Sequence, residues 1–218
     1  MPRAVLSTIV LTLTCATGAA AQPTTYPRWD AGGSWGLTFT NHDDLKAFDD
    51  NDPAANALNV DFGRYFTPHL KADVGVMWSQ SHYLYADPVV RPIPGLPREL
   101  SYLEWTPVTI TPTTVSTALT YQFRDNELMH PYLSAGVRTI WQATHAERYA
   151  STVTIRGIRY DIPAVDERST SVVARPFVAV GCKSYFNQWV FMRSEWLVAF
   201  GPAGYSHSTL RIGTGFDF

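Results

Sequence analysis

The amino-acid sequence predicts an all-β fold, an eight-stranded antiparallel up-and-down β-barrel. Apolar and non-apolar side chains alternate with a period of two in eight segments of roughly ten residues, and no helical spacing is sustained. The joins between segments alternate between tight turns and long loops, as in an up-and-down barrel. The 218 residues are enough for one sizeable core. We therefore expect one β-domain.

The first four segments each place apolar residues on one face and mostly Gly, Ser, Thr or charged residues on the other. The tight joint "FTPHL" follows the second segment, and "RDNELMHP" follows the fourth. Long joins cover 41–56 and 83–107. The four apolar faces are Trp35, Leu37 and Phe39; Leu58, Val60, Phe62 and Phe66; Leu70, Ala72, Val74, Val76 and Trp78; and Val115, Thr117, Leu119, Tyr121 and Phe123.

The last four segments repeat the pattern, with the tight joint "FNQW" after the sixth. The long join 146–171 contains "STVTIRGIRYDI", a second alternating stretch that predicts a hairpin of its own. The apolar faces are Leu133, Ala135, Val137, Thr139 and Trp141; Val178, Val180 and Cys182; Val190, Met192, Trp196, Val198 and Phe200; and Leu210, Ile212, Thr214, Phe216 and Phe218.

Alternation alone does not say which face is inside, so a soluble lipocalin-like barrel with an apolar interior is the structural alternative. Three observations favour a transmembrane barrel instead. The non-apolar faces carry small residues and charges of both signs, which suits a crowded interior. Lysine is scarce, with Lys46, Lys71 and Lys183 as its three occurrences. Aromatic residues lie near the ends of the apolar faces, as in membrane girdles: Phe66, Trp78, Phe123, Trp141, Phe200 and Phe218.

In hydrocarbon an unpaired backbone N–H or C=O group costs several kcal/mol. A transmembrane sheet must therefore close, and we expect the first segment to pair with the eighth.

The N-terminal residues 1–21 have the features of a secretion signal peptide. Arg3 supplies the positive charge, an apolar run follows, and small residues lead to a cleavage site near Ala21. Residues 22–218 then form the barrel domain. Cys15 lacks the preceding residues of a lipoprotein signal, and Cys182 remains alone after cleavage, which excludes an intramolecular disulfide. We expect Cys182 to face lipid as a small apolar residue.

The non-apolar faces predict a lumen filled by side chains rather than an open channel, because eight strands leave little interior space. If the turn after the sixth segment and the C-terminus lie at one rim, Glu195 and Arg211 are opposite each other and form an ion pair. A gated ion path through these charges is the alternative. Arg175 and Asp217 also point inward, and the candidates for ion pairs in the lumen are Asp61, Lys71, Asp73, Arg138, Lys183, Arg193, Glu195 and Arg211.

The stretches "HPYLSAGVRTIW", "VFMRSEWLVAF" and "TLRIGTGFDF" resemble the small bacterial outer-membrane β-barrel family, with its OmpA-like, OmpX-like and opacity-type porin-family domains. The resemblance covers most of the chain after residue 21. It implies the bacterial outer membrane as location, membrane lipid as surroundings, and the barrel-assembly machinery as a partner during insertion. In such proteins a terminal aromatic preceded by alternating apolar residues serves as the assembly signal; here the matching residues are Leu210, Ile212, Phe216 and Phe218, with Thr214 the weakest position.

Enzymatic function is an alternative, because some outer-membrane barrels modify lipid A. The deacylase type places His and Ser two apart on one strand face, whereas His207 and Ser208 are adjacent and point to opposite faces. Ser81 and His82 are likewise adjacent, and His145 shares a face with Glu147 but with no Ser or Cys. We expect no catalytic residues and no cofactor.

Metal and nucleic-acid binding have little support in the sequence. No His, Cys and Asp cluster has metal-ligand spacing, and the acidic stretch "HDDLKAFDDND" lacks the glycine and terminal glutamate of a calcium loop. The formal net charge of −2 does not favour binding to nucleic acid.

The sequence thus favours a monomeric barrel with an inert scaffold and an envelope structural or adhesion-like role carried by its long loops. A lipid-modifying enzyme and a small pore are the alternatives. The loop residues that could contact a partner, a host surface or a polysaccharide are the aromatics Tyr102, Trp105, Tyr149 and Tyr160 and the aliphatic Leu103.

Overall fold

The computed structural model describes residues 27–40, 54–85, 89–92, 101–104, 106–123, 128–155, 157–202 and 204–218. The predicted signal peptide 1–21, the acidic stretch 42–52 and Trp105 lie outside these residues. No helix within the described ranges has the length and apolarity required to cross a membrane.

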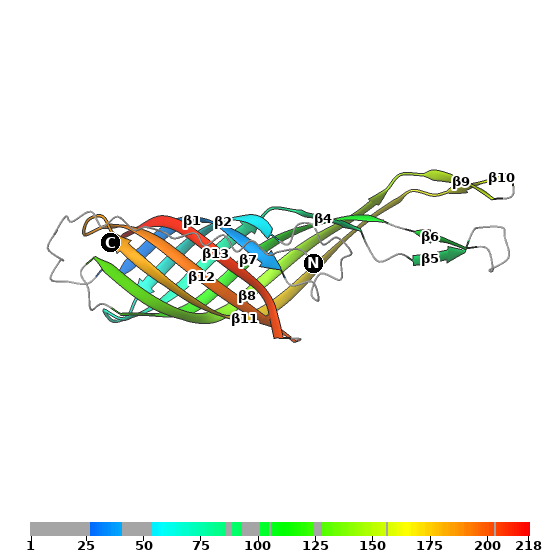
Figure 1. Cartoon of the computed structure of the whole chain (residues 1–218). Coiled ribbons are helices and arrows are strands. Elements are labelled where there is room, and N and C mark those ends of the chain that lie inside the picture. The colour runs from blue at the N-terminus through cyan, green and yellow to red at the C-terminus, as the bar shows by residue number, and fades with distance from the viewer. Residues whose placement is uncertain are drawn as a thin grey trace, which may run out of the picture.

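The fold is a closed barrel of eight antiparallel strands (Figure 1), which confirms the predicted fold class. Barrel strands that follow one another in the sequence lie side by side and pair, and β3 is followed in the barrel by β7. A short strand β4 (His82–Tyr85) continues along β7 beyond the end of β3. The barrel strands are β1 (Trp29–Thr40), β2 (Ala54–Tyr65), β3 (Leu70–Ser79), β7 (Pro107–Gln122), β8 (Met129–Arg148), β11 (Val165–Tyr185), β12 (Val190–Gly201) and β13 (Gly204–Asp217).

The barrel closes where β1 pairs with β13, as the sequence predicts. The register runs from Asp30 opposite Asp217 to Thr40 opposite His207. Just beyond the Asp30–Asp217 end of this seam, the N–H groups of Arg28 and Trp29 donate to the carbonyl of Phe218, at 3.1 and 2.8 Å. Backbone groups along the seam are therefore paired, as a sheet surrounded by lipid requires.

The apolar faces point away from the barrel axis and the charges point into it. Leu210 and Phe216 are 54% and 59% exposed, whereas Arg193 and Glu195 are 7% and 4% exposed. The predicted orientation is confirmed, and the lipocalin-like alternative is wrong for this chain. Cys182 is half-buried on the outward face. All six of the predicted girdle residues are exposed: Phe66, Trp78, Phe123, Trp141, Phe200 and Phe218.

The two ends of the barrel differ. At the end that we call the turn end, 66–69 and 186–189 join the strands by short turns. At the opposite end, the loop end, two ribbons project beyond the barrel (Figure 1). One is the hairpin of β5 (Val89–Pro92) and β6 (Ser101–Glu104), which lies within the predicted long join 83–107.

The other projection replaces most of the predicted loop 146–171 with regular structure. β8 continues to Arg148 and pairs there with Val165, the first residue of β11. The two strands therefore extend further into this region than the predicted loop boundaries at 146 and 171 allow. A ribbon with water on both faces shows no apolar alternation, so the sequence pattern does not reveal the extension. Beyond it, β9 (Ser151–Ile155) and β10 (Ile158–Ile162) form the predicted separate hairpin, with Gly157 at a φ of 79° in its turn.

A β-bulge interrupts the pairing of β12 with β13 near the loop end. Ala199 is opposite His207, whereas Phe200 is opposite Tyr205, so Ser206 is an extra residue. Ser206 and His207 are 4% and 6% exposed, and both side chains are therefore inside the barrel.

Candidate functional site

The lumen near the turn end is organised around Lys183 of β11, which is fully buried. Its Nζ donates to Asp30 Oδ2 at 2.5 Å, to Asp217 Oδ1 at 2.9 Å and to the Tyr65 hydroxyl at 2.9 Å. These three hydrogen bonds use all the donors of the ammonium group. Lys183 is thus satisfied by residues from β1, β2 and β13.

A second lysine shares one of these carboxylates. Lys71 of β3 donates to Asp30 Oδ2 at 2.6 Å and lies 2.7 Å from Asp73 Oδ1. Thr120 of β7 donates to the other oxygen of Asp73 at 2.5 Å. Asp30 therefore bridges β3 and β11, two strands that are not neighbours in the sheet.

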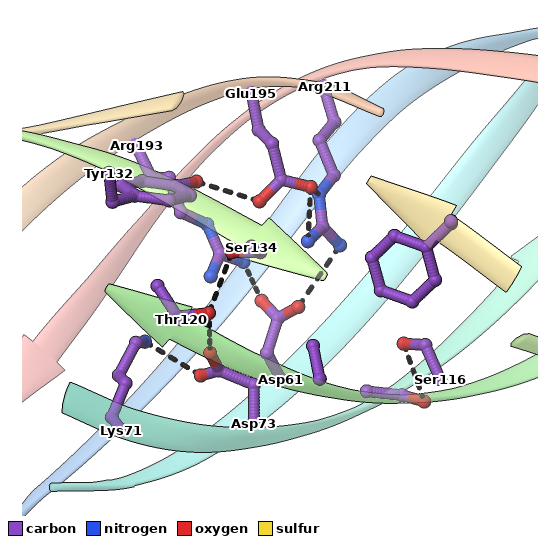
Figure 2. Close-up of a pocket in the computed structure, with 13 residues that line it drawn as sticks. Asp61, Lys71, Asp73, Ser116, Thr120, Tyr132, Ser134, Arg193, Glu195 and Arg211 are labelled. Carbon is purple, nitrogen blue, oxygen red and sulfur yellow. Dashed lines mark hydrogen bonds and ion pairs between the residues drawn. The ribbon is translucent and has the colours of Figure 1, made fainter. Parts of the chain in front are cut away.

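A group of arginines and carboxylates lies near Lys71 and Asp73 (Figure 2). Arg211 pairs with Glu195 at 2.7 Å, as the register predicts, and with Asp61 at 3.1 Å. Arg193 donates to the second oxygen of Asp61. The Tyr132 hydroxyl donates to Glu195 at 2.7 Å. We call the whole set the lumen network: Asp30, Asp61, Lys71, Asp73, Lys183, Arg193, Glu195, Arg211 and Asp217.

Little space remains inside the lumen network. A cavity of about 20 Å³ lies among Asp61, Asp73, Arg193 and Glu195, with Phe177 on its lining. This volume holds about one water molecule. An apolar cluster of Phe177, Ala179, Leu197 and Ala199, with Ala118 packed against it, adjoins the cavity. At the level of the network the barrel is therefore filled by side chains, as predicted.

Arg138 departs from the prediction that it takes part in an ion pair. It is inside the barrel and 3% exposed, but no carboxylate of the described residues lies within 4 Å of it. Its Nη1 lies 3.0 Å from His207 Nε2 and 3.4 Å from Thr209 Oγ1, and its Nη2 lies 3.0 Å from Met77 Sδ. The inward face of the strand was predictable, but the absence of a partner depends on the stagger of distant strands.

The structure brings together seven of the eight predicted ion-pair candidates, with Arg138 as the exception. Sequence reasoning missed Asp30, which joins the two lysines. Asp30 has the same even numbering as the inward residues Ser34 and Thr38 of β1, so extending that alternation toward the N-terminus would have found it. The four residues of the predicted assembly signal are exposed, and their role stays a prediction: Leu210, Ile212 and Phe216 of β13, and Phe218 directly after it.

The histidine pairs weighed for catalysis have other neighbours. His207 is buried and Ser208 is half-buried on the opposite face, while the bulge places Ser206 Oγ 3.4 Å from His207 Nδ1. His145 Nε2 lies 3.0 Å from Asp166 on the projecting ribbon, where Asp166 is largely exposed. Within the described ranges, no group of three or more His, Cys, Asp or Glu residues could hold a metal ion.

Comparison with known proteins identifies the fold. No protein-family model matches the chain, and no curated protein matches it. Among solved structures, the N-terminal β-barrel domain of Pseudomonas aeruginosa OprF matches with a TM-score of 0.50 and 11% identity, covering 89% of this chain and all of that domain. The Yersinia pestis attachment invasion locus protein Ail matches with a TM-score of 0.52 and 8% identity, at 89% and 100% coverage.

The chain therefore has the fold of the small eight-stranded outer-membrane β-barrels. Identities this low establish architecture, whereas activity depends on particular residues and loops.

Proposed function

We propose that the protein is an integral outer-membrane barrel with a closed lumen, and that it interacts with other surfaces through its projecting ribbons. The observation that carries the first part is the exposed apolar wall around a charged interior. Residues such as Leu58, Leu119 and Phe216 are more than 55% exposed in a closed barrel, which is unfavourable in water and favourable in hydrocarbon.

A protein in the outer membrane would have two kinds of partner. Outer-membrane lipid covers the apolar wall, and the barrel-assembly machinery acts during insertion on Leu210, Ile212, Phe216 and Phe218. The barrel is a monomer in this proposal, since closure of β1 on β13 leaves no barrel edge for a second copy. The turn end faces the periplasm and the loop end faces outward, as is usual for barrels of this kind.

The ribbon of β8, β11, β9 and β10 supports the interaction role. Its surface combines an 80% exposed Tyr149 with charged residues of both signs. A recess of about 450 Å³ near its base is lined by Pro107, Thr109, His145, Glu147, Arg148, Tyr149, Ala150 and Ser151. An exposed aromatic beside polar groups on a rigid support suits recognition of a polar surface. The similar fold of a protein named for attachment and invasion supports the same proposal.

Two experiments test the two parts separately. Membrane fractionation with gel mobility before and after heating tests the barrel; we expect the protein in the outer-membrane fraction with heat-modifiable mobility. A soluble periplasmic protein would contradict the proposal.

The interaction role is tested by replacing 149–164 with a two-residue Asn-Gly turn that joins β8 to β11. We expect unchanged heat-modifiable mobility and at least a tenfold loss of attachment of expressing cells to epithelial cells or extracellular matrix. As a matched control, replacing Ser171 with Ala leaves the hairpin in place and should leave attachment unchanged. Equal attachment by cells with and without the hairpin, or with and without the protein, would contradict the role.

A further inference from the structure

Arg138 differs from the other inward-facing charges whose contacts the structure gives in full. It is 3% exposed, and its Nε has no hydrogen-bond partner. A guanidinium keeps its charge even when it is buried, and a buried charge without a counter-charge is costly. The arrangement therefore calls for a negative charge near Arg138.

The side chains in contact with Arg138 cannot supply that charge. Thr209 and Met77 are neutral. His207 places Nε2 3.0 Å from Nη1, and because a guanidinium carries only donors, Nε2 must accept and the imidazole is neutral. Nδ1 then holds the proton and faces Ser206 Oγ at 3.4 Å. All three side chains in contact with Arg138 are therefore uncharged.

The neighbouring strand adds a second positive charge instead of a negative one. In the register of β8 with β11, Arg138 is directly opposite Arg175, and both arginines act electrostatically on His207. The side chain directly opposite Arg138 therefore supplies no negative charge.

The carboxylates of the lumen network are already used. Asp30, Asp73 and Asp217 pair with Lys71 or Lys183, and Asp61 and Glu195 pair with Arg193 or Arg211, all within 3.1 Å. Four cations thus share five carboxylates, so the network carries one negative charge in excess. Each of these carboxylates nevertheless has a cation within 3.1 Å, and none of them lies within 4 Å of Arg138.

We propose that Arg138 is the centre of a binding site for a small inorganic anion of the halide class, inside the barrel toward its loop end. The guanidinium donates to the anion through Nε, which has no hydrogen-bond partner among the described residues. A hydroxyl donor is at hand in Thr209, whose oxygen lies 3.4 Å from Arg138 Nη1 and 3.2 Å from the hydroxyl oxygen of Thr38. A monovalent ion suits a single fully buried guanidinium better than a phosphate would, because the charge to be balanced is one.

Crystals of the wild-type barrel grown or soaked in sodium bromide give a direct test. We expect an anomalous bromide peak within about 3.5 Å of Arg138 Nε, the upper limit of a hydrogen bond to a large anion. A peak that also appears on exposed arginines such as Arg168 with equal height would mark an adventitious ion only, and would overturn the proposal. An empty site in bromide would do the same.

Solution measurements test the site without crystals. The midpoint of the heat-induced mobility change is compared in sodium bromide and in sodium gluconate at equal ionic strength. We expect bromide to raise the wild-type midpoint by about 2–4 °C, the effect of about 1 kcal/mol of binding free energy on a domain of this size. Arg138→Met should lose this halide response, and Arg168→Met, an exposed arginine on the ribbon, should keep it.

A second variant, Arg138→Lys, is used in case Arg138→Met does not fold. Lysine keeps the positive charge but has no Nε–H group at that position, so we expect a reduced halide response. An identical response in wild type and Arg138→Lys or Arg138→Met would contradict the site. A sodium sulfate arm distinguishes the ion class: a larger shift in sulfate than in bromide would show that the site takes divalent oxyanions and that the halide assignment is wrong.

Discussion

The lumen network and the surroundings of Arg138 handle buried charge in two different ways. In the network, carboxylates from β1, β2, β3, β12 and β13 meet cations from β3, β11, β12 and β13 at 2.5–3.1 Å, apart from the closer Asp61–Arg193 contact. Around Arg138 the neighbours are a histidine, a threonine and a methionine. Burial is nearly complete in both places, so exposure to water does not explain the difference.

Side chains that fill the interior of a narrow barrel do not by themselves balance its buried charges. In the lumen network, protein side chains both fill the space and balance the charges, and each lysine or arginine forms ion pairs that connect strands. The Arg138 region is filled by protein, but its charge is not neutralised by the residues in contact with it. Substitutions in the lumen network should therefore lower the free energy of unfolding, whereas replacing Arg138 by an apolar residue should leave it nearly unchanged or raise it.

Lys183→Met should have the largest effect. The methionine fills most of the volume, but Asp30 and Asp217 lose a buried partner, and breaking a buried ion pair from one side costs about 3–5 kcal/mol. Denaturant unfolding in detergent micelles measures the loss. Ser184→Ala, on the outward side of the same strand, is the control and should change the free energy of unfolding by less than about 0.5 kcal/mol. A loss below 1 kcal/mol for Lys183→Met would show that the network is not needed for stability.

Glu195→Gln should cost less, about 1–3 kcal/mol. The amide can still interact with Tyr132, and Arg211 keeps its contact with Asp61 at 3.1 Å. The same unfolding experiment reports the loss. Planar-bilayer recordings on this variant and on Glu195→Ala should give conductance near zero, as for the wild type, because Phe177 and its apolar neighbours still fill the barrel. Steady ion current through Glu195→Ala would favour the small-pore alternative.

Arg138→Met should change stability by less than about 1 kcal/mol in gluconate, and the change can be stabilising. Replacing a buried charge that lacks a partner by an apolar group of similar volume removes a desolvation penalty. A loss as large as that of Lys183→Met, measured side by side, would mean that Arg138 is compensated within the protein and would remove the contrast between the two regions.

Asp166→Asn, on the projecting ribbon, should have the smallest effect, about 0.5 kcal/mol or less. Asp166 lies 3.0 Å from His145 and is 65% exposed, and water and salt screen an ion pair of this kind. The variant sets the scale for a charge change outside the barrel. If its effect exceeded that of Glu195→Gln, the ribbon would contribute more to stability than its exposure indicates.

The barrel wall was predictable from sequence because its two faces meet different environments. An apolar outer face and a crowded polar interior impose a period of two, and the exposed Leu210 beside the inward Arg211 shows it directly. The ribbon formed by β8 and β11 has water on both sides, so residues such as Thr144 and Ser169 pair without any alternation in polarity. Only the terminal hairpin, with glycine at its turn, was visible in that region.

Inside the barrel, only contacts between adjacent strands were predictable from the sequence. Glu195 and Arg211 are directly opposite across one hairpin, so their register follows from the turn. Asp30 and Lys183 are 153 residues apart and meet across the barrel axis, which depends on strand tilt and stagger that the sequence does not state. The bulge at Ser206, which brings two successive side chains inside, also has no clear sequence signal.

The seam between β1 and β13 also constrains when the protein can become complete. Residues 30–40 have their ladder partners at 207–217, so the first barrel strand to leave a ribosome must wait for the last one before half of its hydrogen bonds can form. Until then the edge of β1 that faces β13 has no partner within the chain. The time needed to make and deliver residues 207–217 therefore sets a lower limit on the time between synthesis and a sealed cylinder.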